Sequence, residues 1–317
     1  MIARELIAVP SFASEVEQGL TSFPKTLPSK LFYDAAGSVL FEKITELPEY
    51  YLTRTELGIL RKHASAMARA VSPDSTIVEL GAGTAAKTCT LLRAFAKRQM
   101  RVMYFPVDIS WDALAEARER VSKESPQTCI RPVVADFSDG FGFLHDIPGR
   151  KLVLYLGSSI GNFETSAAID MLRSVRSELS SGDALLLGTD LVKDPAILVP
   201  AYDDAQDVTS EFNKNLLRRF NRELDADFDL ASFRHVAKWN AKYSRMEMHL
   251  ESLEAQIVNL RSLNLHVRFA NGERIHTENS YKYTLDNVRE MLTIAGFSPG
   301  KTWLDRKKWF ALHLARV

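Results

Sequence analysis

Short apolar stretches recur through the first two thirds of the chain, and their lengths predict strands. These stretches are rich in β-branched and aliphatic residues, which is typical of strands buried on both faces, and they span residues 76–80, 102–107, 130–135, 151–156 and 184–188. The segments between them carry apolar residues at helical spacing, for example Ile169, Leu172 and Val175. Strands that alternate with helices in this way predict an α/β fold with a parallel sheet.

The alternation is interrupted after the fifth predicted strand. Residues 196–230 are polar and rich in helix-forming residues, and residues 234–269 alternate between apolar and polar positions with a period of two. A period of two is typical of antiparallel strands with one buried face, so we expect an inserted β-meander. The first pattern then returns as a helix and two strands joined by a tight turn, at residues 285–295, 301–305 and 309–315. These three elements predict an antiparallel hairpin at the edge of the parallel sheet.

The segment before the first predicted strand follows neither pattern. Residues 24–56 combine prolines, small residues and aromatic residues, which suits neither a plain helix nor a strand. Its tyrosines include Tyr33 and Tyr50, which have Asp34 and Glu49 as sequence neighbours. We interpret this segment as a lid rich in hydrogen-bond donors. Packing of the same rings in a hydrophobic core is the alternative interpretation.

A glycine turn follows the first predicted strand and is a candidate ligand site. Gly81 and Gly83 allow a sharp turn and a close approach of a ligand, and the helix that follows offers unpaired amides. The dinucleotide-binding pattern G-x-G-x-x-G needs a third glycine, but Ala86 and Lys87 stand at that end of the turn. An acidic strand residue, here Glu79, followed by G-x-G is similar to the turn of class I methyltransferases that bind S-adenosylmethionine. An ordinary turn between a strand and a helix is the alternative.

Acidic residues end the second and third predicted strands. Asp108 ends the second strand, where a carboxylate can accept hydrogen bonds from both hydroxyls of a ribose. Asp136 and Phe137 end the third strand and offer an acceptor for the exocyclic amine of adenine and an apolar face for its ring. These residues predict a site for an adenosyl ligand. The alternative for Asp108 is that it caps the helix that begins at Ser110.

A loop of small residues, Gly157 to Asn162, follows the fourth predicted strand. Open α/β sheets bind their ligands outside the carboxyl ends of the strands, and this loop lies at such an end. Its small side chains leave room for a methyl donor and a nucleophile to meet. Asn162 ends this loop, and a simple turn residue is the alternative to a functional role for it.

Composition and charge narrow the classes of function. The chain has 317 residues, enough for one large α/β domain or two smaller ones. Its 40 basic and 40 acidic residues cancel, which disfavours a nucleic-acid-binding or polybasic membrane-binding surface. Two cysteines, Cys89 and Cys129, are too few for a disulfide framework or a cysteine zinc site. Residues 1–23 mix charged and apolar residues and lack the apolar core of a signal peptide, so we expect a soluble, cytoplasmic protein.

Four longer stretches carry a more specific resemblance. They are F-Y-D-A-A-G-S at residues 32–38, L-P-E-Y-Y-L-T-R-T-E at 47–56, G-T-D-L-V-K-D at 188–194 and H-T-E-N-S-Y-K-Y at 276–283. With them the chain resembles, over essentially its whole length, the L-histidine Nα-methyltransferases of ergothioneine biosynthesis. The resemblance implies a class I (Rossmann-like) S-adenosylmethionine-dependent methyltransferase fold with an inserted α+β substrate-binding domain. It implies a methyltransferase domain at residues 57–191 and 283–317, and a substrate-binding domain at residues 1–56 and 192–282.

The resemblance also implies which residues form the site. The implied cofactor contacts are Gly81, Lys87, Asp108, Asp136 and Phe137. The implied substrate contacts are Asn162 and Tyr202 at the carboxylate and amine, Tyr33 and Tyr50 as aromatic hydroxyls around the substrate, and Glu278, Ser280 and Met248 at the imidazole. Tyr33 and Asn162 are the residues expected to act in catalysis.

The spacing of Glu278 and Ser280 is consistent with their implied role. Residues two apart on an extended segment point the same way, so both side chains could reach the two ring nitrogens of one imidazole. The alternative for Glu278 is a solvated carboxylate on a strand, which is usual for glutamate.

The implied reaction is the transfer of three methyl groups from S-adenosyl-L-methionine to the α-amine of L-histidine, which gives hercynine and S-adenosyl-L-homocysteine. The expected partners are histidine and its mono- and dimethylated forms, and the protein is expected to act as a monomer without a metal, a nucleic acid or a membrane.

Three alternative functions stay open from the sequence. Methylation of another aromatic amino acid or its derivative is disfavoured by Glu278, because an indole gives a buried carboxylate a poor partner. A cofactor-binding sensor without activity is disfavoured by the intact Asn162, Tyr202 and Glu278. A nicotinamide dehydrogenase is disfavoured by the missing third glycine and by the predicted final hairpin.

Overall fold

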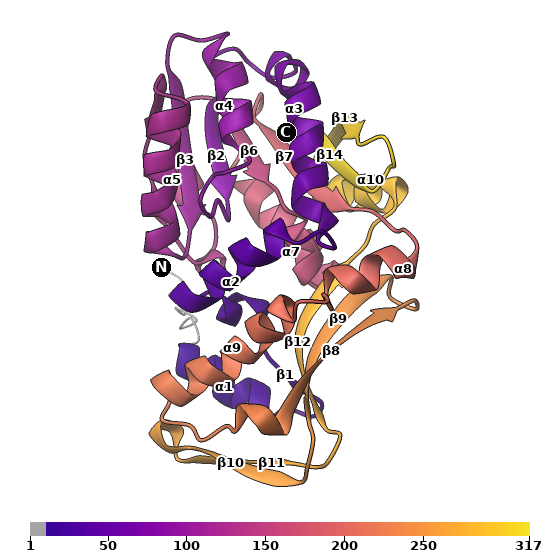
Figure 1. Cartoon of the computed structure of the whole chain (residues 1–317). Coiled ribbons are helices and arrows are strands. Elements are labelled where there is room, and N and C mark those ends of the chain that lie inside the picture. Colours follow the sequence, from indigo (N-terminus) through magenta and orange to yellow (C-terminus); the bar gives the residue numbers. More distant parts are fainter. Residues whose placement is uncertain (1–10) are drawn as a thin grey trace, which may run out of the picture.

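A computed structural model describes residues 11–317, and two β-sheets organise them (Figure 1). The larger sheet has eight strands, with β13-β14-β7-β6-β2-β3-β4 in order and β5 also paired to β3. The strands are β2 (Thr76–Leu80), β3 (Val102–Asp108), β4 (Thr128–Ile130), β5 (Val133–Val134), β6 (Lys151–Tyr155), β7 (Ala184–Asp190), β13 (Ser298–Leu304) and β14 (Phe310–Arg316). All of these pairs are parallel except those made by β14, which runs antiparallel to β7 and β13. The predicted parallel sheet and its final hairpin are therefore confirmed.

The third predicted strand is divided into two. Residues 130–135 were expected to form one strand, but β4 ends at Ile130 and β5 begins at Val133. Pro132 lies between them and has no amide hydrogen for a continuous ladder. Both short strands still pair with β3, so their carboxyl end lies beside Asp108.

Helices cover both faces of the larger sheet (Figure 1). They are α3 (Tyr51–Arg69), α4 (Cys89–Ala96), α5 (Trp111–Glu124), α6 (Phe143–Asp146), α7 (Thr165–Ser177) and α10 (Leu285–Ile294). Successive strand residues belong to different hydrophobic clusters, for example Ile77 to one and Val78 to the other, and both are fully buried. Each such side chain stabilises the fold by roughly 1.5–3 kcal/mol. Burial on both faces explains why these strands are continuously apolar.

The smaller sheet has four strands in the order β1-β12-β9-β8. They are β1 (Lys25–Thr26), β12 (Arg274–Tyr281), β9 (Arg245–Ser252) and β8 (Phe233–Asn240). The expected β-meander is wrong in its pairing, because β9 pairs with β12 while β10 (Gln256–Leu260) and β11 (Leu265–Phe269) form a separate hairpin. The periodicity of the sequence predicts strands, but it does not determine which strands pair with each other.

The N-terminal segment is more helical than expected. Within residues 24–56 the chain forms η1 (Ser29–Phe32) and α2 (Ala35–Glu46), besides β1 and the start of α3. The Asp34 carboxylate begins α2 by accepting from the Gly37 amide at 2.7 Å, as an N-cap does. α2 then packs against α9 (Val208–Glu223). α1 (Phe12–Thr21) and α8 (Pro195–Leu198) complete the helices around the smaller sheet.

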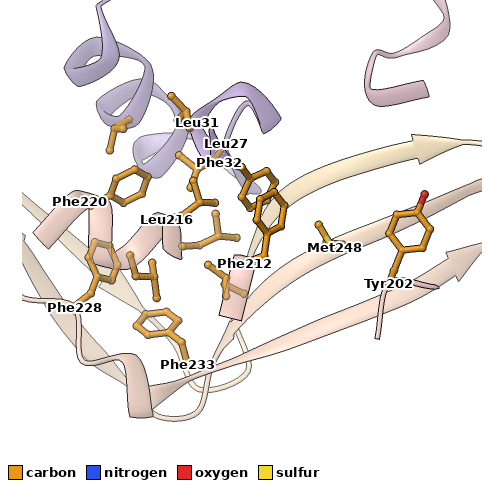
Figure 2. Close-up of a cluster of buried hydrophobic side chains, with 14 of the residues drawn as sticks. Leu27, Leu31, Phe32, Tyr202, Phe212, Leu216, Phe220, Phe228, Phe233 and Met248 are labelled. Atoms are coloured by element: carbon orange, nitrogen blue, oxygen red, sulfur yellow. The ribbon is translucent and has the colours of Figure 1, made fainter. Parts of the chain in front are cut away.

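An aromatic core joins the N-terminal segment to α9 and the smaller sheet (Figure 2). Phe32 stacks on Phe212 of α9, with ring centroids 4.5 Å apart. Phe220 of the same helix packs against Phe228, which in turn packs against Phe233 of β8. Residues far apart in the sequence therefore form one core, as the substrate-binding domain implied by the resemblance would require. Residues 1–10 of that implied domain lie outside the described part of the chain.

The two sheets meet where the chain leaves β7 and β12. The Tyr283 amide donates to the Asp190 carbonyl at 3.0 Å, and the Val192 amide donates to the Tyr283 carbonyl at 3.0 Å. The predicted domain boundary between residues 56 and 57 falls inside α3. Among residues 11–317, no helix combines the length and the apolar character needed to span a membrane.

Candidate functional site

The carboxyl ends of β2, β3 and β5 lie along one edge of the larger sheet and carry the predicted cofactor contacts. β2 ends at Leu80 before the glycine turn, and β3 ends at Asp108. The Gly81 amide donates to the Val107 carbonyl at 2.8 Å, and the Ala135 amide donates to the Asp108 carbonyl at 3.1 Å. The turn, Asp108 and the segment before Asp136 are therefore neighbours in space.

The glycine turn faces open space. Gly81 and Gly83 have φ angles of +67° and +51°, which favour glycine, and a Cβ on either would meet no atom within 4 Å. The Asp108 carboxylate accepts from the Gly83 amide at 2.9 Å and from the Ser110 amide at 3.0 Å. Ser110, rather than Asp108, is the N-cap of α5, because its hydroxyl accepts from the Ala113 amide. Asp108 is thus held beside the turn with both oxygens oriented by backbone amides.

A buried glutamate connects this turn to the loop after β6. Glu56 of α3 is completely buried and pairs with Lys87 Nζ at 2.5 Å. The same carboxylate accepts from the Gly157 amide at 2.9 Å. A Cβ at Gly157 would lie 3.2 Å from Lys87 Nζ, so the glycine allows the lysine to approach. Lys87, which the resemblance places at the cofactor, is held by Glu56, and the sequence analysis did not single out Glu56.

The predicted adenine contacts lie at the other end of the same edge. Asp136 pairs with Lys30 of η1 at 3.0 Å, and Lys30 also pairs with Glu15 of α1 at 2.8 Å. Phe137 packs with its ring against Phe141, with centroids 5.5 Å apart, and lies edge-on to the buried Tyr155. The N-terminal helices therefore contact this edge through an ion pair.

The predicted substrate contacts line one cavity beside the loop after β6. This cavity is lined by all seven of them, Tyr33, Tyr50, Asn162, Tyr202, Met248, Glu278 and Ser280. They come from the N-terminal segment, from η3 (Ser159–Asn162), from the segment after η4 (Val199–Ala201) and from β9 and β12. Gly157 and Ser158 also line it, so the cavity reaches the edge that carries the cofactor contacts.

A β-bulge turns Glu278 and Ser280 toward this cavity. Ile275 pairs with Leu250 and His276 with His249, but Glu278 pairs with Met248, so Thr277 is an extra residue in β12. The side chain of Ile275 faces the hydrophobic core, and strict alternation from it would turn Thr277 and Asn279 inward instead. The bulge shifts the alternation by one residue, as bulges commonly do near functional sites. The expectation that Glu278 and Ser280 share a face is confirmed.

The polar side chains in the cavity contact one another. With its amide nitrogen turned toward β12, Asn162 donates to Glu278 Oε1 and to the Asn279 carbonyl, each at 3.2 Å. The hydroxyls of Tyr202 and Ser280 lie 2.7 Å apart. Burial raises the pKa of Glu278 to about 7, while the positive charge of Lys282 acts to lower it. The acid can therefore change its charge near neutral pH.

The tyrosines of the cavity stay protonated. Burial is the main cause that raises the pKa of Tyr33, Tyr50 and Tyr202 well above that of an exposed tyrosine. Glu278 adds to the shift at each of them by its negative charge. Their hydroxyls are therefore neutral hydrogen-bonding groups.

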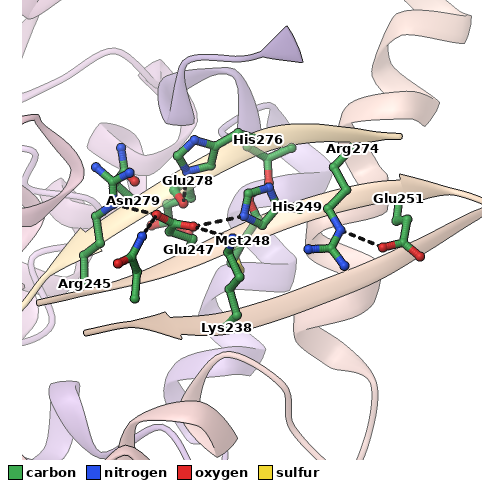
Figure 3. A network of polar contacts seen from close by, with 12 residues as sticks. Lys238, Arg245, Glu247, Met248, His249, Glu251, Arg274, His276, Glu278 and Asn279 are labelled. Atoms are coloured by element: carbon green, nitrogen blue, oxygen red, sulfur yellow. Dashed lines mark hydrogen bonds and ion pairs between the residues drawn. The ribbon is translucent and has the colours of Figure 1, made fainter. Parts of the chain in front are cut away.

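The opposite face of the smaller sheet carries an ionic network (Figure 3). Glu247 accepts from Asn240 and Arg245, each at 2.8 Å, and pairs with Lys238 at 3.0 Å. His249 stacks on His276, with ring centroids 4.7 Å apart. The two faces of this sheet therefore differ, with Glu278 at a cavity on one and Glu247 in a network of cations on the other.

Comparisons with known proteins identify the family. The model of the family "Histidine-specific methyltransferase, SAM-dependent" matches residues 12–317. The chain belongs to this family. It is therefore a methyltransferase that depends on S-adenosylmethionine, and its sheet has the class I, Rossmann-like arrangement.

Three curated relatives of this methyltransferase span different degrees of similarity. Histidine N-alpha-methyltransferase of Mycolicibacterium smegmatis is 45% identical over 308 residues, which cover 97% of this chain and 95% of that protein. Ergothioneine biosynthesis protein 1 of Neurospora crassa is 31% identical over 297 residues, which cover 92% of this chain and 33% of that longer protein. A 4-dimethylallyltryptophan N-methyltransferase of Arthroderma benhamiae is 28% identical over 307 residues, which cover 92% of this chain and 89% of that protein.

The cofactor-side groups of this methyltransferase fit S-adenosylmethionine chemically. The ligand has a charged amino-acid end, a ribose diol and an adenine. Along the edge described above, the open glycine turn, an ammonium at Lys87 and carboxylates at Asp108 and Asp136 complement those groups. Among the described residues, no group of three or more histidine, cysteine, aspartate or glutamate side chains is placed to hold a metal ion.

Several cavity residues were not found from the sequence. Phe41 and Ile44 of α2, and Thr209 and Phe212 of α9, line the cavity as well. The signal for α2 was present, because aspartate is a preferred N-cap residue and Asp34 is followed by the helix formers Ala35 and Ala36. No sequence signal distinguishes the lining residues of α9 from other core residues.

Proposed function

We propose that this methyltransferase transfers three methyl groups in succession to the α-amine of L-histidine and forms hercynine, in the first step of ergothioneine biosynthesis. The observation that carries this proposal is that candidate contacts for both ends of histidine line one cavity, which reaches the cofactor edge at Gly157. A histidine N-alpha-methyltransferase with 45% identity and an ergothioneine biosynthesis protein support the choice of substrate and pathway.

In this proposal the cofactor is held along the carboxyl edge of the larger sheet. Lys87 binds its carboxylate, and the Gly81 turn accommodates its amino-acid end. Asp108 accepts from the ribose hydroxyls, while Asp136 accepts from the adenine amine and Phe137 packs against the ring. When bound, S-adenosylmethionine supplies an electrophilic methyl group on a sulfonium.

The substrate is held by groups from both sheets. Asn162 and Tyr202 bind the carboxylate and amine of histidine, and Tyr33 and Tyr50 surround this end with hydroxyls. Glu278 accepts from a ring N–H, and Ser280 bonds the other ring nitrogen, with Met248 packed beside them. Holding both ends fixes the direction of the amine, and orientation of this kind is a main source of rate in a transfer reaction.

Tyr33 and Asn162 act in catalysis by aiming the amine. Each transfer needs an amine that has lost a proton, so that its lone pair can attack. The raised pKa of Tyr33 keeps its hydroxyl protonated, so it acts as a hydrogen-bond partner while the proton leaves to water. Small residues at Gly157 and Ser158 leave room for the added methyl groups.

The remaining parts of the proposal concern organisation. Residues 57–191 and 283–317 bind the cofactor, while residues 1–56 and 192–282 bind the substrate. The protein acts in the cytoplasm as a monomer on small molecules, without a metal, a nucleic acid or a membrane partner. The equal numbers of acidic and basic residues, 40 of each, support the absence of a polyanionic partner.

Another aromatic amino acid or its derivative is the alternative substrate. The similarity to a 4-dimethylallyltryptophan N-methyltransferase supports this alternative, as do Phe41 and Phe212 in the cavity wall. Glu278 argues against it, because an indole N–H can reach only one of the polar groups on β12.

Mass spectrometry can decide between these substrates. The purified protein is incubated with S-adenosylmethionine and each of the twenty amino acids in turn. The expected result is a mass increase of three methyl groups on histidine and little product with the others. Preferential methylation of tryptophan would support the alternative, and no product from any of the twenty would exclude histidine and every other unmodified amino acid as the substrate.

A further inference from the structure

Lys282 lies behind the cavity wall and contacts two side chains that line the cavity. It directly follows β12, and its side chain is completely buried. Its Nζ atom is 2.7 Å from the Tyr202 hydroxyl and 2.8 Å from the Ser280 hydroxyl. The third neighbour is the Asp190 carboxylate, at 3.0 Å. A lysine ammonium has three N–H donors, so these neighbours use all of them.

The backbone holds Lys282 in place on both sides. Its amide donates to the carbonyl of Ser244, the residue just before β9, at 2.8 Å. The next residue, Tyr283, donates to the Asp190 carbonyl at 3.0 Å, at the end of β7. The ammonium is therefore anchored at the point where the two sheets meet.

Asp190 alone does not account for a buried ammonium at this position. Its carboxylate already accepts from Lys193 Nζ and from the Tyr51 hydroxyl, each at 2.6 Å. A second ammonium leaves a positive excess inside the protein, which is costly unless another acid balances it. Glu278 lines the same cavity as Ser280, which Lys282 contacts, and the positive charge of Lys282 acts to lower the pKa of Glu278. Burial lowers the pKa of Lys282, and the negative charges of Asp190 and Glu278 act against that shift.

The contacts of Lys282 also determine whether the Tyr202 and Ser280 hydroxyls can donate to a ligand or accept from it. Tyr202 Oη and Ser280 Oγ are 2.7 Å apart, so one of them donates to the other. Each also accepts from Lys282. Whichever of the two hydroxyls accepts from the other also accepts from Lys282, so both of its lone pairs are used. Its own hydrogen is not used in either contact and can be donated to a ligand. The cavity wall therefore has a hydroxyl that donates to a ligand and cannot accept from it.

We propose that Lys282 is a positioning residue that makes this wall recognise the bare nitrogen of a neutral imidazole. Glu278, Tyr202 and Ser280 line the same cavity, so its wall holds an acceptor carboxylate and one fixed hydroxyl donor, on either Tyr202 or Ser280. A neutral imidazole has one N–H and one bare nitrogen, which matches that pair. The inference rests on the proposed function, because it takes histidine as the ligand.

Calorimetry with substrate analogues tests this role. Histidine is compared with β-(pyrrol-2-yl)alanine and β-(pyrrol-3-yl)alanine, which keep a ring N–H but lack the bare nitrogen. Each ligand is titrated into protein saturated with S-adenosylhomocysteine. The variants are Lys282→Met, which removes the ammonium, and Lys193→Met, which removes the other ammonium on Asp190 but has no contact with the cavity hydroxyls.

The expected result is that histidine binds more tightly than both pyrrole analogues, and that this affinity ratio depends on Lys282 but not on Lys193. In the wild type both pyrrole analogues should bind about 5- to 100-fold more weakly than histidine, because the fixed donor is left unpaired. In Lys282→Met the hydroxyls can reorient, so this ratio should fall to less than about threefold. Lys193→Met should keep the wild-type ratio. A purely structural role would weaken all ligands alike and leave the ratio unchanged.

Several outcomes would overturn the inference. They are an unchanged ratio in Lys282→Met, or an equal loss of the ratio in Lys193→Met. If Lys282→Met does not fold, the wild type alone decides, since pyrrole analogues that bind as tightly as histidine exclude a fixed donor. Wild-type protein that fails to bind histidine would remove the proposed function as well, whereas histidine binding without discrimination removes only the role of Lys282.

Discussion

The acidic groups of the cofactor edge and of the substrate cavity have different surroundings. At the edge, Asp108 is oriented by the amides of Gly83 and Ser110, and Asp136 is paired with Lys30. In the cavity, burial raises the pKa of Glu278 to about 7, and the neutral side-chain amide of Asn162 donates to its carboxylate. The acids of the edge are held by backbone amides and by an ion pair, whereas the cavity keeps a buried acid whose charge is poorly balanced.

This difference separates the source of cofactor affinity from the source of substrate specificity. A carboxylate already held by backbone amides is pre-organised, so it can bind a ribose without further ordering. A partly desolvated carboxylate penalises every ligand that leaves it unpaired, and such a penalty gives strong discrimination between ligands. We therefore expect changes at the edge to alter affinity and changes in the cavity to alter specificity.

The largest expected effect is on the edge, from Asp108→Ala. Loss of two charge-assisted hydrogen bonds should weaken binding of S-adenosylhomocysteine by about 2–4 kcal/mol, roughly 30- to 1000-fold, in calorimetry. Asp108→Asn is the matched control, since its amide oxygen can still accept from one backbone amide, and it should lose less. Unchanged affinity in the alanine variant would remove Asp108 from the cofactor site.

The next effect is on the cavity, from Glu278→Ala. Histidine loses its charged ring partner, so kcat/KM for histidine should fall about 10- to 150-fold. The penalty on apolar rings is removed at the same time, so the ratio of kcat/KM for histidine over tryptophan should fall further, and more so when Met248 is also made smaller. Affinity for S-adenosylhomocysteine is the control and should not change. A constant ratio would mean that Glu278 does not recognise the ring.

The edge was predictable from sequence because its signals are local. Gly81, Asp108 and Asp136 each follow an apolar strand, and parallel strands place such ends together. Cavity residues came from the resemblance instead, since Tyr33, Asn162 and Glu278 belong to distant segments that only the fold brings together.

The features that sequence reasoning missed have physical reasons. The pairing of β9 with β12 rather than β10 is a choice among strands of similar pattern. The bulge at Thr277 shifts Glu278 into the cavity without any glycine or proline to mark it. Glu56 and Lys282 are completely buried, although their residue types are usually exposed. Such charges are recognisable only once their partners are known.

A smaller effect separates the two ends of the substrate. Asn162→Ala and Tyr202→Phe should each weaken histidine and dimethylhistidine alike, by about 1–2 kcal/mol or roughly 5- to 30-fold, because both contact the amino-acid head group in the proposed function. Binding of S-adenosylhomocysteine, measured in the same titrations, should stay unchanged. Loss of cofactor affinity in both variants would mean that the loop at residues 157–162 binds the cofactor rather than the substrate.

The smallest expected effect is on stability, from Glu278→Gln. The folded-state pKa of about 7 lies above the usual glutamate value, so between about pH 4.5 and 7 the folded protein binds more protons than the unfolded chain. This carboxyl group therefore costs stability as the pH rises through that range. Glutamine removes the cost, so the variant should be about 1–2 kcal/mol more stable than the wild type at pH 8 and equal to it near pH 4.5.

Glu247→Gln, on the other face of the same sheet, should give the opposite sign. Burial acts to raise the pKa of Glu247, but hydrogen bonds from Asn240, Lys238 and Arg245 outweigh it and lower the pKa to about 2. That stabilisation is present above the usual glutamate pKa and is lost as the pH falls toward 2. The glutamine variant should therefore be about 1–2 kcal/mol less stable than the wild type at pH 8, and the difference should shrink in acid. Urea unfolding of both variants at several pH values measures this, and shifts of the same sign would contradict the idea that only the cavity face holds a destabilising acid.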